Sequence, residues 1–108
     1  PVQARIVNVT DAQMDYTSEM KSRLAAAGIR VETDLRNEKL GVKIREAQVA
    51  KIPYVLVVGD REVADGGFSV RLRSGENVGF RTLEETVSMI RADSDEPFKR
   101  GGMSYSFA

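Results

Sequence analysis

The chain has 108 residues, which suits one domain with a single core and leaves no room for separate catalytic and binding domains. It contains neither cysteine nor histidine, and sixteen basic residues balance sixteen acidic ones, so the net charge at pH 7 is zero. These totals exclude disulfides, thiolate metal sites and catalysis by Ser-His or Cys-His pairs, and they disfavour sequence-independent nucleic-acid binding, which needs a basic surface.

The first half of the chain alternates short apolar runs with amphipathic segments. A continuous apolar run bounded by Pro53 and Gly59 indicates a central strand covered on both faces. The order of elements is typical of a doubly wound α/β fold with right-handed crossovers. The expected elements are a strand over 4–9, a helix capped by Thr10 or Asp11 and ended by Gly28, a strand toward the sheet edge over 29–33, a helix over 38–50 and a strand over 52–58.

Gly41 stands near the start of the second predicted helix, where glycine costs about 1 kcal/mol relative to alanine. Two explanations remain open at this point. The helix can simply tolerate the glycine, or the missing side chain can leave room for something that approaches the backbone.

Beyond residue 64 the pattern changes to that of an antiparallel hairpin. Turn signals at 65–67 and 74–77 flank an alternating run over 68–73, and a short run follows over 78–80. The sheet is therefore expected to be mixed, with a parallel half and an antiparallel half.

The remainder of the chain divides into a third helix, which Thr82 is placed to cap, and a tail. Helical periodicity is lost from Asp93 onward, so we expect one domain over 1–92 and a flexible tail over 93–108. Pro1 in place of an initiator methionine suggests a processed chain or a piece of a longer one. The sequence shows no export signal and no apolar run long enough for a bilayer, so we expect no membrane contact and a cytoplasmic location.

Polar residues follow the predicted strands at the edge where ligands of such sheets gather. Asp11, Asp34 and Asp60 stand where a phospho-receiver domain carries its carboxylates, but helix capping and turns explain them better. The glycines match no phosphate-binding loop. Further donors and acceptors are expected close together in space at the loop, on the adjacent helix and along the hairpin, namely Arg36, Asn37, Arg45, Arg61, Glu62, Arg71 and Arg73. Arginine with glutamate can satisfy a guanine edge and asparagine a pyrimidine edge, although such residues can equally form surface ion pairs.

Several motifs together closely resemble the C-terminal anticodon-binding domain of bacterial threonyl-tRNA synthetases, which are class II enzymes. They are DLRNEK over 34–39, KIRE over 43–46, IPY over 52–54 and GDRE over 59–62. The prolyl enzyme has a related domain and is kept as an alternative. The threonyl family is preferred because the prolyl domain does not usually continue with Ile-Arg-Glu. The resemblance implies a three-layer α/β fold in which a five-stranded mixed sheet is flanked by three helices.

The resemblance also implies a function, which is to read the second and third anticodon bases of threonine tRNA, a guanine and a uracil. Arg71 and Glu62 would take the guanine, and Asn37 with Arg45 the uracil. Arg36, Arg61 and Arg73 would make supporting contacts with the RNA.

The same resemblance implies that the chain alone is not catalytic. ATP, magnesium and zinc would be used by other domains of a parent synthetase, which is expected to be a homodimer and to contact this chain through its catalytic domain. Two other classes stay open, namely a stand-alone protein-interaction domain of the same fold and a receiver-like or nucleotide-binding enzyme.

Overall fold

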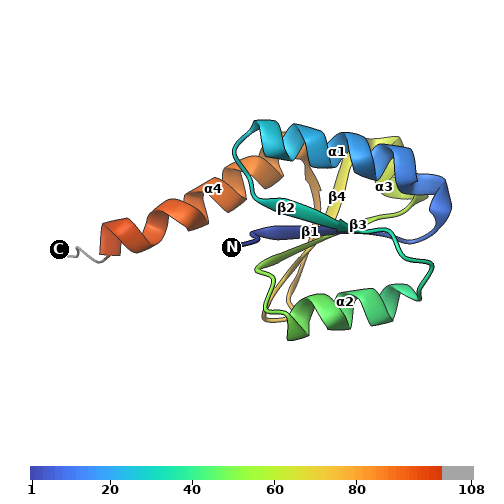
Figure 1. The fold of residues 1–108 in the computed structure, drawn as a ribbon. Coiled ribbons are helices and arrows are strands. Elements are labelled where there is room, and N and C mark those ends of the chain that lie inside the picture. Colours follow the sequence, from blue (N-terminus) through green and yellow to red (C-terminus); the bar gives the residue numbers. More distant parts are fainter. Residues whose placement is uncertain (101–108) are drawn as a thin grey trace.

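A five-stranded sheet forms the middle layer of the molecule (Figure 1). The computed structural model describes the backbone of residues 1–100 and the side chains of residues 1–93. The strands are β1 (Ala4–Asn8), β2 (Val31–Asp34), β3 (Tyr54–Val58), β4 (Gly67–Leu72) and β5 (Asn77–Thr82), in the order β2-β1-β3-β4-β5. β1 pairs in parallel with β2 and β3, whereas β4 is antiparallel to both β3 and β5. The expected mixed sheet is confirmed.

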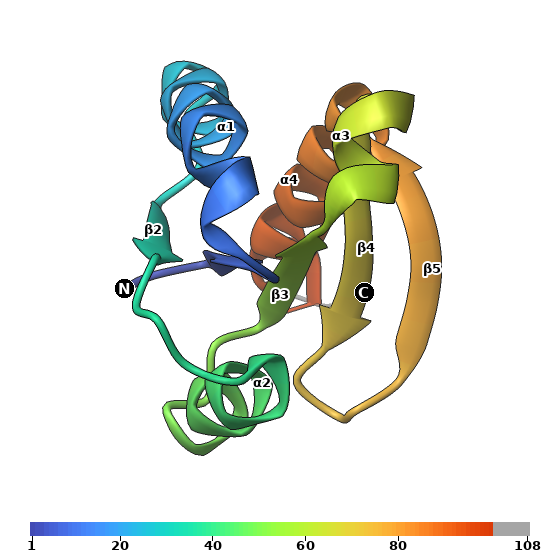
Figure 2. The same cartoon turned by 90° about the vertical axis from the view of Figure 1, so that its right-hand side faces the viewer.

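Helices cover both faces of the sheet, which makes three layers (Figures 1 and 2). The helices are α1 (Met14–Ala26), preceded by the 3-10 turn η1 (Asp11–Gln13), then α2 (Leu40–Val49), α3 (Asp60–Asp65) and α4 (Leu83–Arg100). α1 and α4 lie on one face and α2 lies on the other. The prediction of a three-layer α/β fold is confirmed.

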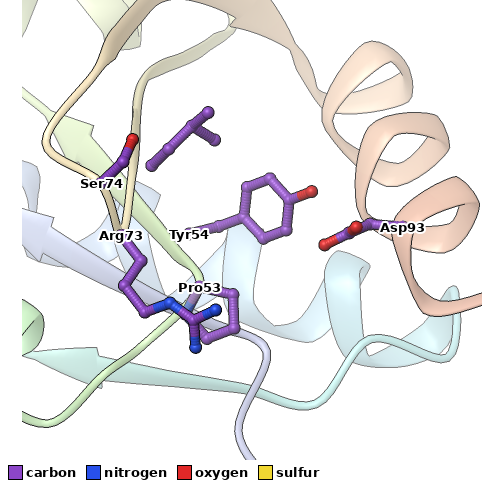
Figure 3. Close-up of a pocket in the computed structure, with 6 residues that line it drawn as sticks. Pro53, Tyr54, Arg73, Ser74 and Asp93 are labelled. Atoms are coloured by element: carbon purple, nitrogen blue, oxygen red, sulfur yellow. The ribbon is translucent and has the colours of Figure 1, made fainter. Parts of the chain in front are cut away.

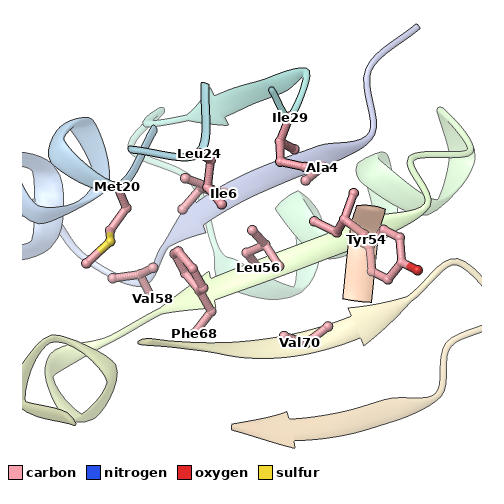
Figure 4. Packing of buried hydrophobic residues seen from close by; sticks show 11 residues of the cluster. Ala4, Ile6, Met20, Leu24, Ile29, Tyr54, Leu56, Val58, Phe68 and Val70 are labelled. Atoms are coloured by element: carbon pink, nitrogen blue, oxygen red, sulfur yellow. The ribbon is translucent and has the colours of Figure 1, made fainter. Parts of the chain in front are cut away.

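Two apolar clusters hold the layers together. The larger one joins α1 and α4 to the sheet, with Leu24, Leu56 and Phe68 fully buried (Figure 4). The smaller one packs Ala47 of α2 against Val55 on the opposite face. All five residues of β3 are buried, and β2 lies at an edge of the sheet, as the sequence predicts.

Most strand and helix ends lie one or two residues from the expected positions, and larger or structurally relevant differences occur at Ile29, at 60–65 and at the end of α4. Ile29 was predicted to begin the second strand, but it precedes β2 and is buried in the larger cluster. The segment 60–65 was expected as a charged turn but forms α3, a fourth helix, because Glu62 accepts a hydrogen bond from the Gly59 N–H at 2.8 Å and closes the first turn. α4 continues to Arg100, beyond the predicted loss of periodicity at Asp93. The predicted tail therefore includes helical residues, and its last eight residues lie outside the described part of the chain.

A chain of hydrogen bonds runs along the carboxyl edge of the parallel strands and connects α2 to α3. Lys43 of α2 is 1% exposed, and its Nζ donates to the carbonyl oxygen of Asn8 at 3.0 Å and to Asn8 Oδ1 at 2.8 Å. Asn8 Nδ2 donates to the Thr10 carbonyl at 2.7 Å, and the Thr10 N–H donates to Gln13 Oε1 at 2.7 Å. Gln13 Nε2 donates in turn to Oδ1 of Asp60, the first residue of α3, at 2.7 Å. Both helices are thus fixed to the end of β1.

The first prediction concerns the buried ammonium group of this chain. Lys43→Met keeps an aliphatic side chain but leaves the two Asn8 oxygens without their buried donor. We expect the free energy of unfolding, measured by urea denaturation, to fall by about 1–3 kcal/mol. Lys21→Met, on the exposed side of α1, serves as the control. Equal stability of the two variants would contradict the account.

The second prediction compares two glycines. A Cβ on Gly67 would lie 2.6 Å from Phe80 Cζ and still closer to the Arg81 carbonyl oxygen, whereas one on Gly41 would meet nothing within 4 Å. Gly67→Ala should lower the free energy of unfolding by about 1–3 kcal/mol because backbone must move. Gly41→Ala should raise it by about 1 kcal/mol because alanine favours the helix. Thermal denaturation of both variants measures these changes. A change of the same sign in the free energy of unfolding of both variants would contradict the prediction.

Candidate nucleic-acid interface

One half of the sheet is uncovered on the side of α2. α2 packs over the parallel strands, and β4 and β5 extend beyond it (Figure 2). Residues that pair directly across antiparallel strands share a face, so Ser69 and Arg71, opposite Val57 and Val55, point to the side of α2, and so does Phe80, which pairs with Ser69. Ser69 and Arg71 are half-buried and Phe80 is exposed. We call this surface, formed by Ser69, Arg71 and Phe80, the open face.

Glu62 is held at the edge of the open face by α3 and β4. Its Oε1 accepts from the Gly59 N–H and its Oε2 accepts from the Ser69 hydroxyl, both at 2.8 Å. Burial raises the pKa of Glu62, but the hydrogen bonds from Ser69 and Gly59 outweigh burial and hold the pKa below its ordinary value. Glu62 is therefore ionised at neutral pH. A carboxylate has about four lone-pair sites, so it can still accept from a ligand.

Arg71 lies two residues beyond Ser69 on the same face of β4, a distance of roughly 7 Å along the strand. Within the described residues its guanidinium makes no hydrogen bond or ion pair. The structure thus brings Arg71 and Glu62 to one surface through Ser69, although they are nine residues apart in the sequence.

The side of α2 nearest the hairpin carries Gly41, Arg45 and Gln48. Spacings of four and three residues place them on one side of the helix. The hairpin turn between β4 and β5 approaches this side, because a Cβ on Gly75 would lie 3.8 Å from Gln48 Nε2. A surface hollow of about 360 Å³, lined by Lys39, Gly41, Val42 and Arg45, adjoins it. The hollow agrees with the second explanation for Gly41, in which the missing side chain leaves room for something that approaches the backbone.

Asn37 and Arg45 belong to adjacent parts of the α2 region. Asn37 is exposed in the loop between β2 and α2, and Arg45 is exposed on the helix. Neither side chain is engaged by the part of the chain that the structure describes. Both are available as hydrogen-bond donors.

Arg36, in contrast, is committed to the protein. Its guanidinium donates to both carboxylate oxygens of Asp34, at 2.8 Å each, and pairs with Glu46. The hydrogen bonds from Arg36 hold the pKa of Asp34, a buried residue, below its ordinary value. Arg36 therefore connects Asp34 at the end of β2 with Glu46 on α2.

The two remaining arginines lie apart from each other. Arg61 is exposed on α3 beside Glu62. Arg73 lies at the opposite end of β3, where its N–H donates to the Pro53 carbonyl at 3.0 Å. There it lines a hollow of about 290 Å³ with Pro53, Tyr54, Leu72, Ser74 and Asp93 (Figure 3). Supporting roles for Arg36, Arg61 and Arg73 stay predictions.

Sequence reasoning missed the residues that hold this surface in place. Ser69 positions Glu62, but in the sequence it is only one polar residue of a predicted strand. Lys43, with Asn8, positions α2, but in the sequence it looks like part of a charged helix face. A signal for Lys43 exists in the sequence, since it shares the inward stripe with Leu40 and Ala47 at spacings of three and four.

Two negative findings apply to the described residues. No group of three or more histidine, cysteine, aspartate or glutamate side chains among them could hold a metal ion. In the same part of the chain, no helix has the length and apolar character needed to cross a membrane.

Curated threonine–tRNA ligases match the whole chain. The one from Nitratidesulfovibrio vulgaris (strain DSM 19637 / Miyazaki F) is 66% identical over 108 residues, which cover 100% of this chain and 17% of the relative. The one from Lawsonia intracellularis is 51% identical, with the same coverage. The chain thus spans a small part of the length of the curated relatives it matches.

Solved structures share the fold. The RNA-binding domain of threonyl-tRNA synthetase from Cryptosporidium parvum Iowa II superposes with a TM-score of 0.78 at 24% identity, covering 85% of this chain and 23% of that one. Histidyl-tRNA synthetase from Nostoc sp. PCC 7120 superposes with a TM-score of 0.79 at 26% identity, and the match covers 87% of this chain and 23% of that one. The expected resemblance to the threonyl-tRNA synthetase domain is confirmed. A family model described as the anticodon binding domain matches residues 3–93, and the chain therefore belongs to the anticodon-binding domain family.

Proposed function

We propose that this chain is the anticodon-reading module of a threonine–tRNA ligase and selects threonine tRNA by the second and third anticodon bases. One observation carries the proposal: the ionised carboxylate of Glu62 and the unengaged donors Asn37, Arg45 and Arg71 gather around α2 and the open face. The 66% identity to a threonine–tRNA ligase supports the choice of tRNA.

Glu62 and Arg71 suit a guanine. Guanine offers the acceptors O6 and N7 and the donors N1–H and N2–H. The guanidinium of Arg71 can donate to the acceptors, and a free lone pair of Glu62 can accept from the donors. Because Ser69 and Gly59 fix the carboxylate in advance, little side-chain entropy is lost when it meets the base.

Asn37 and Arg45 suit the neighbouring uracil. An amide presents both a donor and an acceptor, which matches the pairing edge of uracil, and a guanidinium can donate to a carbonyl oxygen of the base. The net charge of the chain is zero, which fits selective reading of bases better than neutralisation of many phosphates.

The rest of the reaction belongs, in this proposal, to domains outside the chain. Those domains would bind ATP and magnesium, hold a zinc ion and join threonine to the tRNA, and the parent would be a cytoplasmic homodimer. The name of the relatives and the small share of them that the chain covers support this division. The chain alone should bind RNA and catalyse nothing.

The proposal is tested by titrating the chain with anticodon stem-loops, using fluorescence anisotropy at fixed ionic strength. A loop with guanine as the second anticodon base should bind more tightly than one with adenine. Replacing one base that is read in this way typically costs about 1–3 kcal/mol. Equal affinity for the two loops would overturn the proposal.

A third prediction separates base reading from general attraction. Arg71→Ala should reduce the difference in binding free energy between the guanine and adenine loops by about 1–3 kcal/mol, because the donor to O6 and N7 is lost. Arg23→Ala removes the same charge from α1, on the opposite face of the sheet, and should leave that difference unchanged. If both variants lose the same amount, the effect is electrostatic and Arg71 reads no base.

A further inference from the structure

Phe80 is a large aromatic side chain on the open face that is 37% exposed. One edge of its ring packs over Gly67, where a Cβ would lie 2.6 Å from Phe80 Cζ and 2.9 Å from Cε1. The absence of a side chain on Gly67 therefore leaves room for the ring against β4. The rest of the side chain is exposed, and Ser69 is its cross-strand partner.

Phe80 and the carboxylate of Glu62 have Ser69 as a common neighbour. Phe80 pairs directly with Ser69 across β4 and β5. The Ser69 hydroxyl donates to Glu62 Oε2 at 2.8 Å, and α3, which carries Glu62, ends at Asp65, two residues before β4 begins at Gly67. An apolar plane and a fixed acceptor thus flank the same serine, and Arg71 follows two residues along the strand.

Covering the glycine explains the buried edge of the ring. An aromatic ring opposite a glycine on a neighbouring strand is a known means of stabilising a sheet. A leucine would cover Gly67 comparably, however, and would present no flat surface to solvent. The flat surface beside a carboxylate and an arginine is what distinguishes Phe80 as a binding feature, because bases stack on aromatic faces while their edges form hydrogen bonds.

We propose that Phe80 is a stacking platform for the base whose edge Glu62 and Arg71 read, a purine in the anticodon loop. This rests on the proposed function and adds a binding residue to it. A purine stacked on the ring turns its edge toward the carboxylate and the guanidinium, so the platform supplies affinity and the two polar residues supply selectivity.

The test is a thermodynamic cycle between the protein and the RNA. The 108-residue chain and its Phe80→Leu variant are each titrated with two stem-loops, one with guanine at the second anticodon position and one abasic there. Phe80→Leu should weaken binding of the guanine loop about tenfold, the size of one lost base–aromatic stack. It should not change binding of the abasic loop. Phe80→Tyr should restore the affinity for the guanine loop.

Stacking also predicts what does not change. Because every base has an aromatic face, Phe80→Leu should weaken binding of the guanine and adenine loops by the same factor. The ratio of the two affinities should therefore stay unchanged. Met14→Leu, a residue 39% exposed on α1, is the matched control and should bind both loops like the unmodified chain. Thermal unfolding of each variant confirms that it is folded.

Two outcomes overturn the stacking proposal while the proposed function stands. In one, the unmodified chain prefers the guanine loop and Phe80→Leu binds it equally well. In the other, Phe80→Leu weakens the abasic loop as much as the guanine loop, which makes the ring a structural residue. If the unmodified chain fails to distinguish guanine from adenine, the proposed function itself fails.

Discussion

The arrangement of this domain depends on the buried contact between Lys43 and Asn8. A lysine at 1% exposure is costly to bury unless its ammonium is hydrogen-bonded, and here both acceptors come from the last residue of β1. The contact fixes α2 at the carboxyl edge of the parallel strands. Thr10 and Gln13 continue the connection to Asp60, so α3 is fixed to the same strand end. The two helices that carry Arg45 and Glu62 are therefore both held by hydrogen bonds to the same strand end.

The polar side chains around this frame divide into those that the protein uses and those that it leaves free. Arg36 is occupied by Asp34 and Glu46, and it keeps α2 in place from the β2 side. Glu62 is partly occupied, because its two structural hydrogen bonds orient a carboxylate that can still accept. Arg71 is unengaged within the described residues. Selective recognition requires side chains that are free to bind and neighbours that are held in place. Side chains fixed in advance lower the entropy that binding costs.

The sequence predicts the fold well because its signals are local. The apolar run between Pro53 and Gly59 indicates a buried strand, and Thr82 with Glu85 forms the cap expected of a helix start. The short helix α3 was missed because six residues carry no periodicity, and only the Glu62 contact with Gly59 marks it. The role of Ser69 depends on which strands become neighbours, and no local pattern encodes that. The inward position of Lys43 can be predicted from helical spacing, but its partner Asn8 is 35 residues away in the sequence. Motif resemblance can suggest Arg71 and Glu62 as partners, but the proximity of Phe80 follows from strand register alone.

The central claim is that RNA binds where α2 and α3 meet the open face, and amide chemical shifts measure this most directly. A ¹⁵N-labelled sample of the chain is titrated with the anticodon stem-loop that has guanine in the middle position, and the shift of each backbone amide is followed. The account predicts that the largest changes cluster at Gly41, Arg45, Glu62, Arg71 and Phe80, with little change along α1. Changes concentrated on α1 and α4, with the open face unaffected, would contradict it.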